Sequence, residues 1–264
     1  MKKKKQGYRK SFRTKKKKSI FKSRIFWIAV LVFLLISGLF YFFILSPVFQ
    51  IKEIRVSGSY KSSSEEIRKI VEENIETKLL FLSTKTIFFD GFSKPREEIM
   101  ESFPVVYQVK IKRDFPSSLE VLVEERIAAA TWRFEENNFL LDSKGVVFEK
   151  NQSVKEPVIS GGRKVSLGES VIEESLVRSI LEVNSKLEGE GIEVKEFLIS
   201  FPKLTLRTEA GWEAYFDLEG NISTQVSNLV LVLEEEITQP KTQDLEYIDL
   251  RFQERIFYKF KDSI

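Results

Sequence analysis

The stretch IFWIAVLVFLLISGLFYFFILS, from Ile25 to Ser46, decides how this chain is organised. Its 22 residues carry no charge, and as a helix it would be about 33 Å long, against about 30 Å for the hydrocarbon core of a bilayer. A buried core helix and a cleaved signal peptide are the alternatives. A signal peptide has a shorter apolar run that ends in small residues, whereas this run continues into bulky phenylalanines. The sequence therefore predicts a retained transmembrane helix over residues 25–46.

The segment before this helix is strongly basic. Residues 1–24 hold 13 of the 42 Lys and Arg residues, and no acidic residue occurs before Glu53. The net charge of +3 thus divides into +13 in the tail and about −10 in the rest, where 29 basic residues face 39 acidic ones. Because basic segments resist translocation, we expect a cytoplasmic tail and an extracytoplasmic segment at residues 47–264, a type II single-pass topology.

The basic tail admits two kinds of partner. Lysines near a membrane attract anionic lipid, which is the interpretation we favour. Nucleic-acid binding is the alternative, but no recognised fold or stacking platform accompanies these lysines, so we expect none.

The sequence contains neither histidine nor cysteine. These absences exclude a Ser-His-Asp or Cys-His nucleophile, a zinc site with His or Cys ligands, and a disulfide. A membrane-tethered glycosidase remains conceivable, because it needs only two acids about 5 to 10 Å apart in a cleft. Its candidates, each better explained as a surface or turn residue, are Glu124, Glu125, Asp142 and Asp217. We expect a protein that is not an enzyme, with no cofactor, metal or small-molecule substrate.

Hydrophobic periodicity beyond the helix predicts a small α+β unit at residues 49–125. The expected order is a strand (51–56), a helix opened by a capping box at Ser62, Ser63, Glu65 and Glu66, a second helix (94–103), and two strands (105–113 and 119–123). The second helix is expected to turn Ile99, Met100 and Phe103 inward.

Residues 126–264 predict a second, β-rich α+β unit. The expected strands are 128–134, a hairpin at 139–148, 192–199, 203–207, 212–216, 247–252 and 256–260, with helices near 170–187 and 223–236. Residues 157–162 are expected to be a connection. We place the boundary between Glu125 and Arg126, with no flexible linker.

Five motifs in this order resemble one known family. They are FQIKEIRVSG (49–58), FPSSLEVLVEER (115–126), FLLDSKGVVF (139–148), PVISG (157–161) and YIDLRF (247–252). Together with the basic tail and single anchor, they resemble the FtsQ/DivIB family of bacterial cell-division proteins. The resemblance implies a POTRA domain at 49–125, an FtsQ/DivIB-like β domain at 126–264, and a noncatalytic divisome scaffold that links early and late division proteins at the septum. The implied partners are FtsB/DivIC and FtsL, with FtsW and the septal transpeptidase as further ones.

The resemblance also implies a binding site. In that family a partner adds a strand alongside the C-terminal strand of the β domain, and an unpaired sheet edge offers main-chain groups for this. The residues implied here are Tyr247, Arg251, Phe252, Glu254, Tyr258 and Phe260. Arg251 and Phe252 match the family's basic and aromatic positions, whereas Glu254 differs in size and charge from the small polar residue found there.

Alternation assigns Ile248 and Leu250 to the core. For Phe252, Tyr258 and Phe260, core and interface stay equal alternatives, since aromatic residues are enriched in both.

One rival class uses the same edge differently. A POTRA-type chaperone or translocation module binds client peptides by strand addition, but such proteins carry several POTRA copies ahead of a barrel, and this sequence shows one copy. We expect a plasma-membrane protein enriched at the septum, in an envelope with either one membrane or two.

Overall fold

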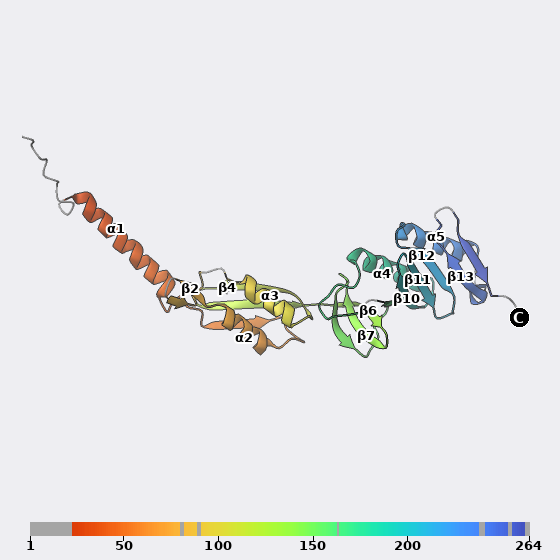
Figure 1. Ribbon diagram of the computed structural model, residues 1–264, viewed down its shortest axis with the longest axis horizontal. Coiled ribbons are helices and arrows are strands. Elements are labelled where there is room, and N and C mark those ends of the chain that lie inside the picture. Colours follow the sequence, from red (N-terminus) through yellow and green to blue (C-terminus); the bar gives the residue numbers. More distant parts are fainter. Residues whose placement is uncertain are drawn as a thin grey trace, which may run out of the picture.

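The computed structural model describes residues 23–79, 82–88, 91–162, 164–237, 241–252 and 255–261. The molecule is elongated, with an N-terminal helix, a three-stranded sheet and a nine-stranded sheet following one another along its long axis (Figure 1). Most of the predicted basic tail, residues 1–22, lies outside the described residues.

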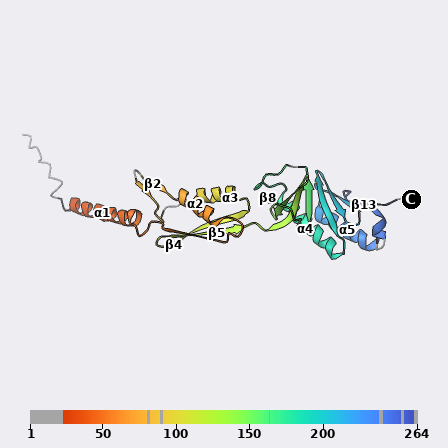
Figure 2. The same ribbon diagram turned by 90° about the horizontal axis from the view of Figure 1, so that it is seen from below.

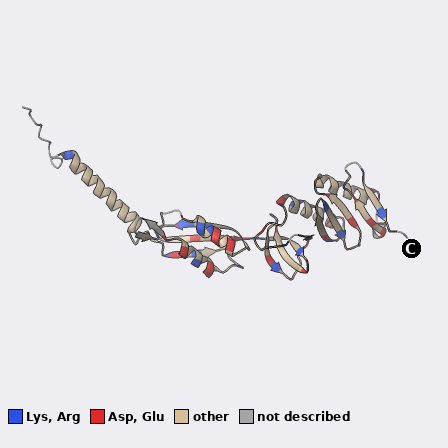
Figure 3. Cartoon of the chain, viewed as in Figure 1, with Lys and Arg blue, Asp and Glu red and all other residues tan. Residues whose placement is uncertain are grey.

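The N-terminal helix is continuous and apolar. Its α-helical part, α1, spans Arg24–Phe40 and passes into the π-helical turn η2, Tyr41–Leu45. The 22 residues are long and apolar enough to cross a membrane, and none of them is buried against the rest of the chain. In Figure 3 the helix is free of charge beyond the basic residue at its start. The predicted apolar helix is therefore present, one residue earlier than expected.

The first sheet has the order β1-β5-β4. Strand β1 (Glu53–Ser57) runs parallel to β5 (Ser118–Glu125), which pairs antiparallel with β4 (Val106–Asp114). Helices α2 (Ser64–Asn74) and α3 (Ser93–Ser102) cover one face of this sheet (Figure 2). A core that includes Ile67, Ile99 and Val121 fills the space between them. The five predicted elements are present in the predicted order, with one additional hairpin between the two helices.

Details of this unit differ from the prediction. Ser63 caps α2 by accepting the Glu66 N–H at 3.3 Å, as the capping box predicts. Met100, expected to face inward, is 42% exposed. One residue turns a helix by about 100°, so a fully buried Ile99 directs Met100 outward. The small hairpin of β2 (Thr77–Leu79) and β3 (Leu82–Thr84) was not predicted.

The second sheet has the order β14-β13-β12-β11-β10-β9-β6-β7-β8. Its elements are β6 (Ala128–Phe134), β7 (Asn137–Asp142), β8 (Val147–Asn151), β9 (Val158–Gly161), α4 (Glu174–Gly189), β10 (Val194–Ser200), β11 (Lys203–Thr208), β12 (Glu213–Asp217), α5 (Ile222–Glu235), the 3-10 helix η3 (Lys241–Asp244), β13 (Leu245–Asp249) and β14 (Phe257–Phe260). Helices α4 and α5 pack on one face, where Trp132, Phe197 and Trp212 are buried in a separate core. The β-rich α+β character is confirmed.

Residues 157–162 are a correction to the sequence-based prediction. Instead of a connection, they contain β9, which lies in the middle of the sheet and runs parallel to both of its neighbours, β6 and β10. Only four residues form this strand, and no alternation of apolar and polar residues marks it. Val158 and Ile159 are both buried and Ser160 and Gly161 are both half-buried, so this short strand has no alternating pattern that the sequence could reveal.

The two units meet at Arg126. Its Nε donates to the carbonyl of Pro104 at 3.0 Å, and its guanidinium pairs with Asp142, the last residue of β7. Lys61, before α2, pairs with Glu149 on β8. Arg126, the residue at the predicted boundary, thus contacts both the first unit and the second.

Candidate functional site

The candidate site is the end of the nine-stranded sheet formed by β13 and β14. Strand β14 pairs antiparallel with β13, with Asp249 opposite Phe257 and Ile248 opposite Tyr258. Among the described residues, no strand pairs with the outer side of β14. Strand β14 is therefore an edge strand of the described sheet, the kind of strand to which another chain can add.

The opposite end of the sheet is different. Val147, at the start of β8, donates its N–H to the Glu169 carbonyl at 3.0 Å and accepts the Gly168 N–H at 2.7 Å. Glu149 on the same strand pairs with Lys61 of the first unit. The chain itself therefore covers part of the β8 edge, whereas the described chain leaves the β14 edge open.

The strand predicted over 247–252 ends at Asp249 and is second from the edge. This is a correction, because Arg251 and Phe252 lie in the connection after the strand. The Asp249 carboxylate accepts the Arg251 N–H at 3.2 Å, as in an Asx turn, which ends the strand. At this end of the sheet the edge strand is therefore β14, with β13 second.

Arg251 is held in place by Asp249. Its Nε donates to Oδ1 at 2.9 Å and its Nη2 to Oδ2 at 2.6 Å, so that the two side chains form a bidentate pair. Burial opposes ionisation of Asp249, but these bonds hold its pKa below the ordinary value of 3.8. The guanidinium lies 5.7 Å from the centre of the Tyr215 ring and 5.9 Å from that of Phe252. A preorganised cation and an aromatic ring therefore stand together beside the edge strand.

Aromatic side chains surround this end of the sheet. Phe252 is 52% exposed and meets Phe257 of β14 edge to face, with ring centres 5.3 Å apart. Tyr258 is 43% exposed and contacts the half-buried Phe260, which packs against the core. Tyr247 stacks on Tyr215 at 5.6 Å.

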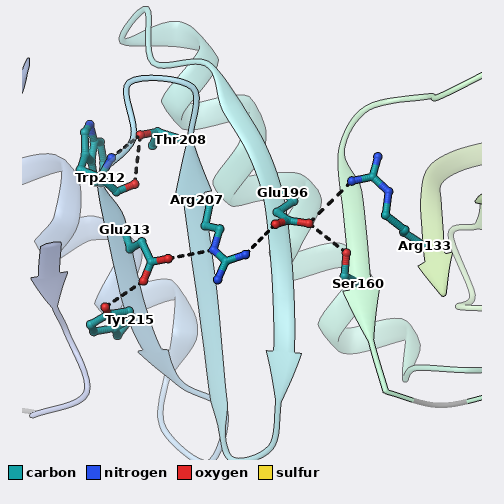
Figure 4. A network of polar contacts seen from close by, with 8 residues as sticks. All are labelled: Arg133, Ser160, Glu196, Arg207, Thr208, Trp212, Glu213 and Tyr215. Atoms are coloured by element: carbon teal, nitrogen blue, oxygen red, sulfur yellow. Dashed lines mark hydrogen bonds and ion pairs between the residues drawn. The ribbon is translucent and has the colours of Figure 1, made fainter. Parts of the chain in front are cut away.

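A ladder of polar contacts leads to this site across the sheet face opposite the helices. Figure 4 shows Glu196 of β10 between Arg133 and Arg207, and Arg207 between Glu196 and Glu213. Arg207 donates to Glu196 at 2.9 Å and to Glu213 at 2.8 Å, and the Tyr215 hydroxyl donates to Glu213 at 2.8 Å. Neighbouring strands are thereby fixed in register up to the ring on which Tyr247 stacks.

The ladder shifts the acidity of its members. Burial, the larger cause, and the hydrogen bond to Glu213 together raise the pKa of Tyr215 to about 12. Burial also opposes ionisation of Glu213, yet hydrogen bonds from Arg207 and Tyr215 hold its pKa below the ordinary 4.5. At neutral pH the ladder therefore contains charged Glu213 and an un-ionised tyrosine, which suits alignment of strands rather than proton transfer.

The structure gathers most of the predicted site residues at this end. Tyr247, Arg251, Phe252, Tyr258 and Phe260 lie on β13, on β14 or between them. Glu254 lies outside the described residues. As predicted, Ile248 and Leu250 are buried in the core, at 0% and 3% exposure.

Sequence reasoning missed two members of the cluster, Phe257 and Tyr215. Phe257 is 47% exposed and contacts Phe252. Successive side chains of a strand point to opposite faces, so the sequence could have placed Phe257 and Lys259 on one face and Tyr258 on the other. The contact of Tyr215 with Tyr247 joins residues on separate strands, so no local pattern indicates it.

Three of the four acids considered for glycosidase chemistry have structural roles. Glu125 accepts the backbone N–H groups of Tyr60, Lys61 and Ser62, and Asp142 pairs with Arg126. Asp217 accepts the Glu219 N–H at 3.0 Å. Within the described ranges, no cluster of three or more acidic side chains is arranged to hold a metal ion.

Comparison with known proteins matches both units. The POTRA domain of FtsQ type matches residues 49–126, and the C-terminal domain of the cell-division protein FtsQ/DivIB matches residues 130–251. An apolar helix, a POTRA domain and this β-rich domain together define a POTRA-bearing cell-division protein. The two matched ranges cover about three quarters of the chain. The chain belongs to the FtsQ/DivIB family.

Relatives named cell division protein DivIB come from several Clostridium species. The protein from Clostridium acetobutylicum is 29% identical over 108 residues, which are 41% of this chain and 40% of that protein. The protein from Clostridium botulinum strain Hall is 25% identical over 198 residues, 74% of each chain. The protein from Clostridium tetani is 26% identical over 137 residues, 50% of this chain and 48% of the relative. The chain thus matches less than half the length of two of these relatives.

Proposed function

We propose that this chain is a bitopic, noncatalytic scaffold of the bacterial divisome that receives a partner strand at β14. The observation that carries the proposal is the open edge of β14, flanked by the exposed aromatic side chains of Phe252, Phe257 and Tyr258. Membership of the FtsQ/DivIB family supports partners of the FtsB/DivIC and FtsL kind, with FtsW and the septal transpeptidase further along the assembly.

The energetics assign separate roles to main chain and side chains. A strand laid along the four residues of β14 gains at most about four main-chain hydrogen bonds, each contributing roughly 0.5 to 1.5 kcal/mol net. A micromolar complex needs about 8 kcal/mol. The main chain therefore supplies direction and register, and burial of the aromatic side chains must supply most of the affinity.

The proposal includes the arrangement of the whole chain. Residues 49–125 form the POTRA domain and residues 126–264 the β domain, which agrees with the two separate hydrophobic cores. The helix at residues 25–46 anchors the chain in the plasma membrane at the septum. The charge of the basic tail supports a cytoplasmic N-terminus and contact with anionic lipid.

A matched pair of substitutions tests the partner edge. Phe252→Glu places a charge beside β14, and Phe201→Glu makes the same change at a residue that is 74% exposed in the turn between β10 and β11. We expect the first variant of the full-length chain to lose capture of FtsB/DivIC and FtsL partners, and the second to retain it. Both should keep the circular dichroism melt of the parent.

Three outcomes contradict the proposal. Equal capture by both variants removes the partner from this edge, and a lowered melting temperature for Phe252→Glu alone makes this side chain part of the core. A fluorescent fusion spread evenly over the membrane of dividing cells, with normal division after depletion, contradicts the divisome role.

A further inference from the structure

The end of the POTRA domain nearest α1 is built from aromatic rings. Phe42 and Phe43 of η2 contact Phe49, which precedes β1, at 5.4 and 5.6 Å between ring centres. Phe88 contacts Phe43 at 5.4 Å and Phe49 at 5.1 Å, and Phe115 contacts Phe88 at 5.7 Å. We name these five residues the aromatic collar.

Three separate segments of the chain meet in the collar. Ile87 donates its N–H to the Phe49 carbonyl at 2.9 Å, which ties the segment after β3 to the segment before β1. Lys52 donates its N–H to the Ser117 carbonyl at 2.8 Å, which ties the turn containing Phe115 to the same place. The collar is therefore a property of the folded domain and not of the apolar helix alone.

The helix ends inside this structure. Side chains of the POTRA domain donate hydrogen bonds to the last carbonyls of the helix, groups that a helix leaves without internal partners. Thr86 Oγ1 donates to the Phe43 carbonyl at 3.2 Å, and Thr84 Oγ1 and Gln50 Nε2 donate to the Ile44 carbonyl at 3.1 and 2.9 Å. With these carbonyls satisfied by protein, the helix end has less need of water.

Much of the collar is exposed, although its side chains are apolar. Phe42 and Phe43 are 49% and 41% exposed, Phe88 is 42% and Phe115 is 57%. Phe42 and Phe43 directly follow α1, whose apolar side chains are exposed as well. A continuous exposed apolar surface indicates an interaction site.

One cluster of charged groups, on β1 and at the end of β4, is paired internally. Arg55 of β1 bonds Glu53 at 2.8 Å and Asp114 at 3.3 Å. Both signs of charge are therefore present and close together. Nothing in this arrangement favours a strongly charged partner, so the apolar rings decide what binds.

We infer that the aromatic collar lies in the headgroup region of the bilayer and seats the POTRA domain on the membrane surface. A helix of 22 residues is about 33 Å long, so its last turn, with Phe42 and Phe43, reaches the boundary of a hydrocarbon core about 30 Å thick. Tryptophan and tyrosine form a belt at this boundary, and exposed phenylalanine side chains of membrane-surface segments bury at the same depth. The collar continues that belt from the helix onto Phe88 and Phe115 of the folded domain. The inference rests on the proposed anchor.

The absence of cysteine allows a clean test in the full-length chain. Single-cysteine variants, each carrying an environment-sensitive fluorophore, are reconstituted in vesicles whose lipids bear a nitroxide quencher either near the headgroups or near the bilayer centre. Leu34→Cys reports on the middle of the helix and Phe115→Cys on the collar. Tyr60→Cys is the control, because this residue is 92% exposed and lies beside Glu125, at the end of β5 about 23 Å from the collar.

We expect the label at Phe115→Cys to be quenched most strongly by nitroxides near the headgroups and to emit at shorter wavelength than the label at Tyr60→Cys. The label at Leu34→Cys should be quenched most strongly from the bilayer centre. Both results should persist in neutral phosphatidylcholine vesicles and at high salt, because the interaction is not ionic. Circular dichroism melts equal to the parent's establish that each variant is folded.

The outcomes separate this inference from the proposed anchor. Quenching of the Leu34→Cys label without quenching of the Phe115→Cys label leaves the anchor in place and overturns the inference. Lack of quenching at Leu34→Cys contradicts the anchor itself. Loss of the Phe115→Cys signal in neutral lipid or at high salt also overturns the inference, since the contact is then electrostatic.

Discussion

The pair formed by Arg126 and Asp142 should make a large contribution to the stability of the β domain. The pair is nearly buried, with side-chain exposures of 13% and 6%. Asp142 Oδ2 accepts from Arg126, while Oδ1 accepts the backbone N–H groups of Lys144 and Val146, both at 2.9 Å. Asp142→Asn keeps an oxygen for the turn but places an amide NH2 group against the guanidinium. The change in stability caused by this substitution therefore measures the ion pair separately from the hydrogen bonds of the turn.

The expected cost follows from the surroundings of Arg126. Removing one partner of a buried pair costs about 3 to 5 kcal/mol. Here the guanidinium keeps its bond to the Pro104 carbonyl at 3.0 Å and its place 5.6 Å from the centre of the Tyr107 ring. We therefore expect the lower end, about 3 kcal/mol, for Asp142→Asn. In a double-mutant cycle with Arg126→Gln, the two changes should be coupled by about 2 kcal/mol.

Urea unfolding of the full-length chain in micelles, followed by tryptophan fluorescence, measures this cost. Trp132 and Trp212 are each 1% exposed in the core of the β domain, and the remaining tryptophan, Trp27, lies in the apolar helix. The signal therefore reports unfolding of the nine-stranded sheet. If Asp142→Asn lowers the free energy of unfolding by less than about 0.5 kcal/mol, the reasoning is refuted. A coupling energy below about 0.5 kcal/mol between Asp142→Asn and Arg126→Gln also refutes it, because additive changes show no interaction.

Three further predictions concern packing, backbone conformation and pH. A Cβ at Gly161 would lie 2.6 Å from a ring atom of Trp132, so Gly161→Ala should lower the free energy of unfolding by about 1 to 3 kcal/mol in the same urea assay; an unchanged midpoint would contradict this. Gly58 has φ +83° and its Cβ would lie 2.2 Å from the Val123 carbonyl oxygen, so Gly58→Ala should lower the circular dichroism melt of the POTRA domain, and an unchanged melt would count against it. Hydrogen bonds with Arg251 keep the pKa of Asp249 low in the folded state despite burial, so the pair stabilises the fold above the unfolded value near 3.8 and this contribution is lost as pH falls through the folded-state value. The melting temperature of the parent should therefore exceed that of Asp249→Asn by the full amount at pH 7, and this difference should shrink as the pH falls below about 4. A difference that does not depend on pH would assign the effect to packing.

Local patterns predicted those elements that local physics determines. The α2 helix was predictable because Ser63 and Glu66 signal its start and Ile67 and Val71 lie on one face. The pairing of β4 with β5 was predictable because alternation and a short turn specify an antiparallel neighbour. The middle strand β9 was not, because its partners, β6 and β10, are fixed by long-range packing around Trp132 and Phe197 and not by its own sequence.

The same distinction applies to the candidate site. Sequence could place Arg251 and Phe252 near the C-terminal strands, since the YIDLRF motif contains both. It could not identify which strand is at the edge, because β13 enters the sheet parallel to β12 through a crossover that includes α5. Contacts between strands, such as that of Tyr215 with Tyr247, likewise depend on a register that no single segment encodes.

The two ends of the nine-stranded sheet differ in a way that bears on how a partner is selected. Residues 168 and 169 cover the start of β8, and Lys61 holds Glu149 from the first unit. In the described part of the chain, no other segment covers the end at β14 in this way. Two features limit unwanted strand pairing there: β14 is only four residues long, and it carries Lys259, which pairs with Glu246 at 2.6 Å. Short, charged edges discourage indiscriminate pairing. A strand that binds there must therefore gain its affinity beyond the backbone, from the aromatic side chains and from Arg251, and these groups decide which strand is accepted.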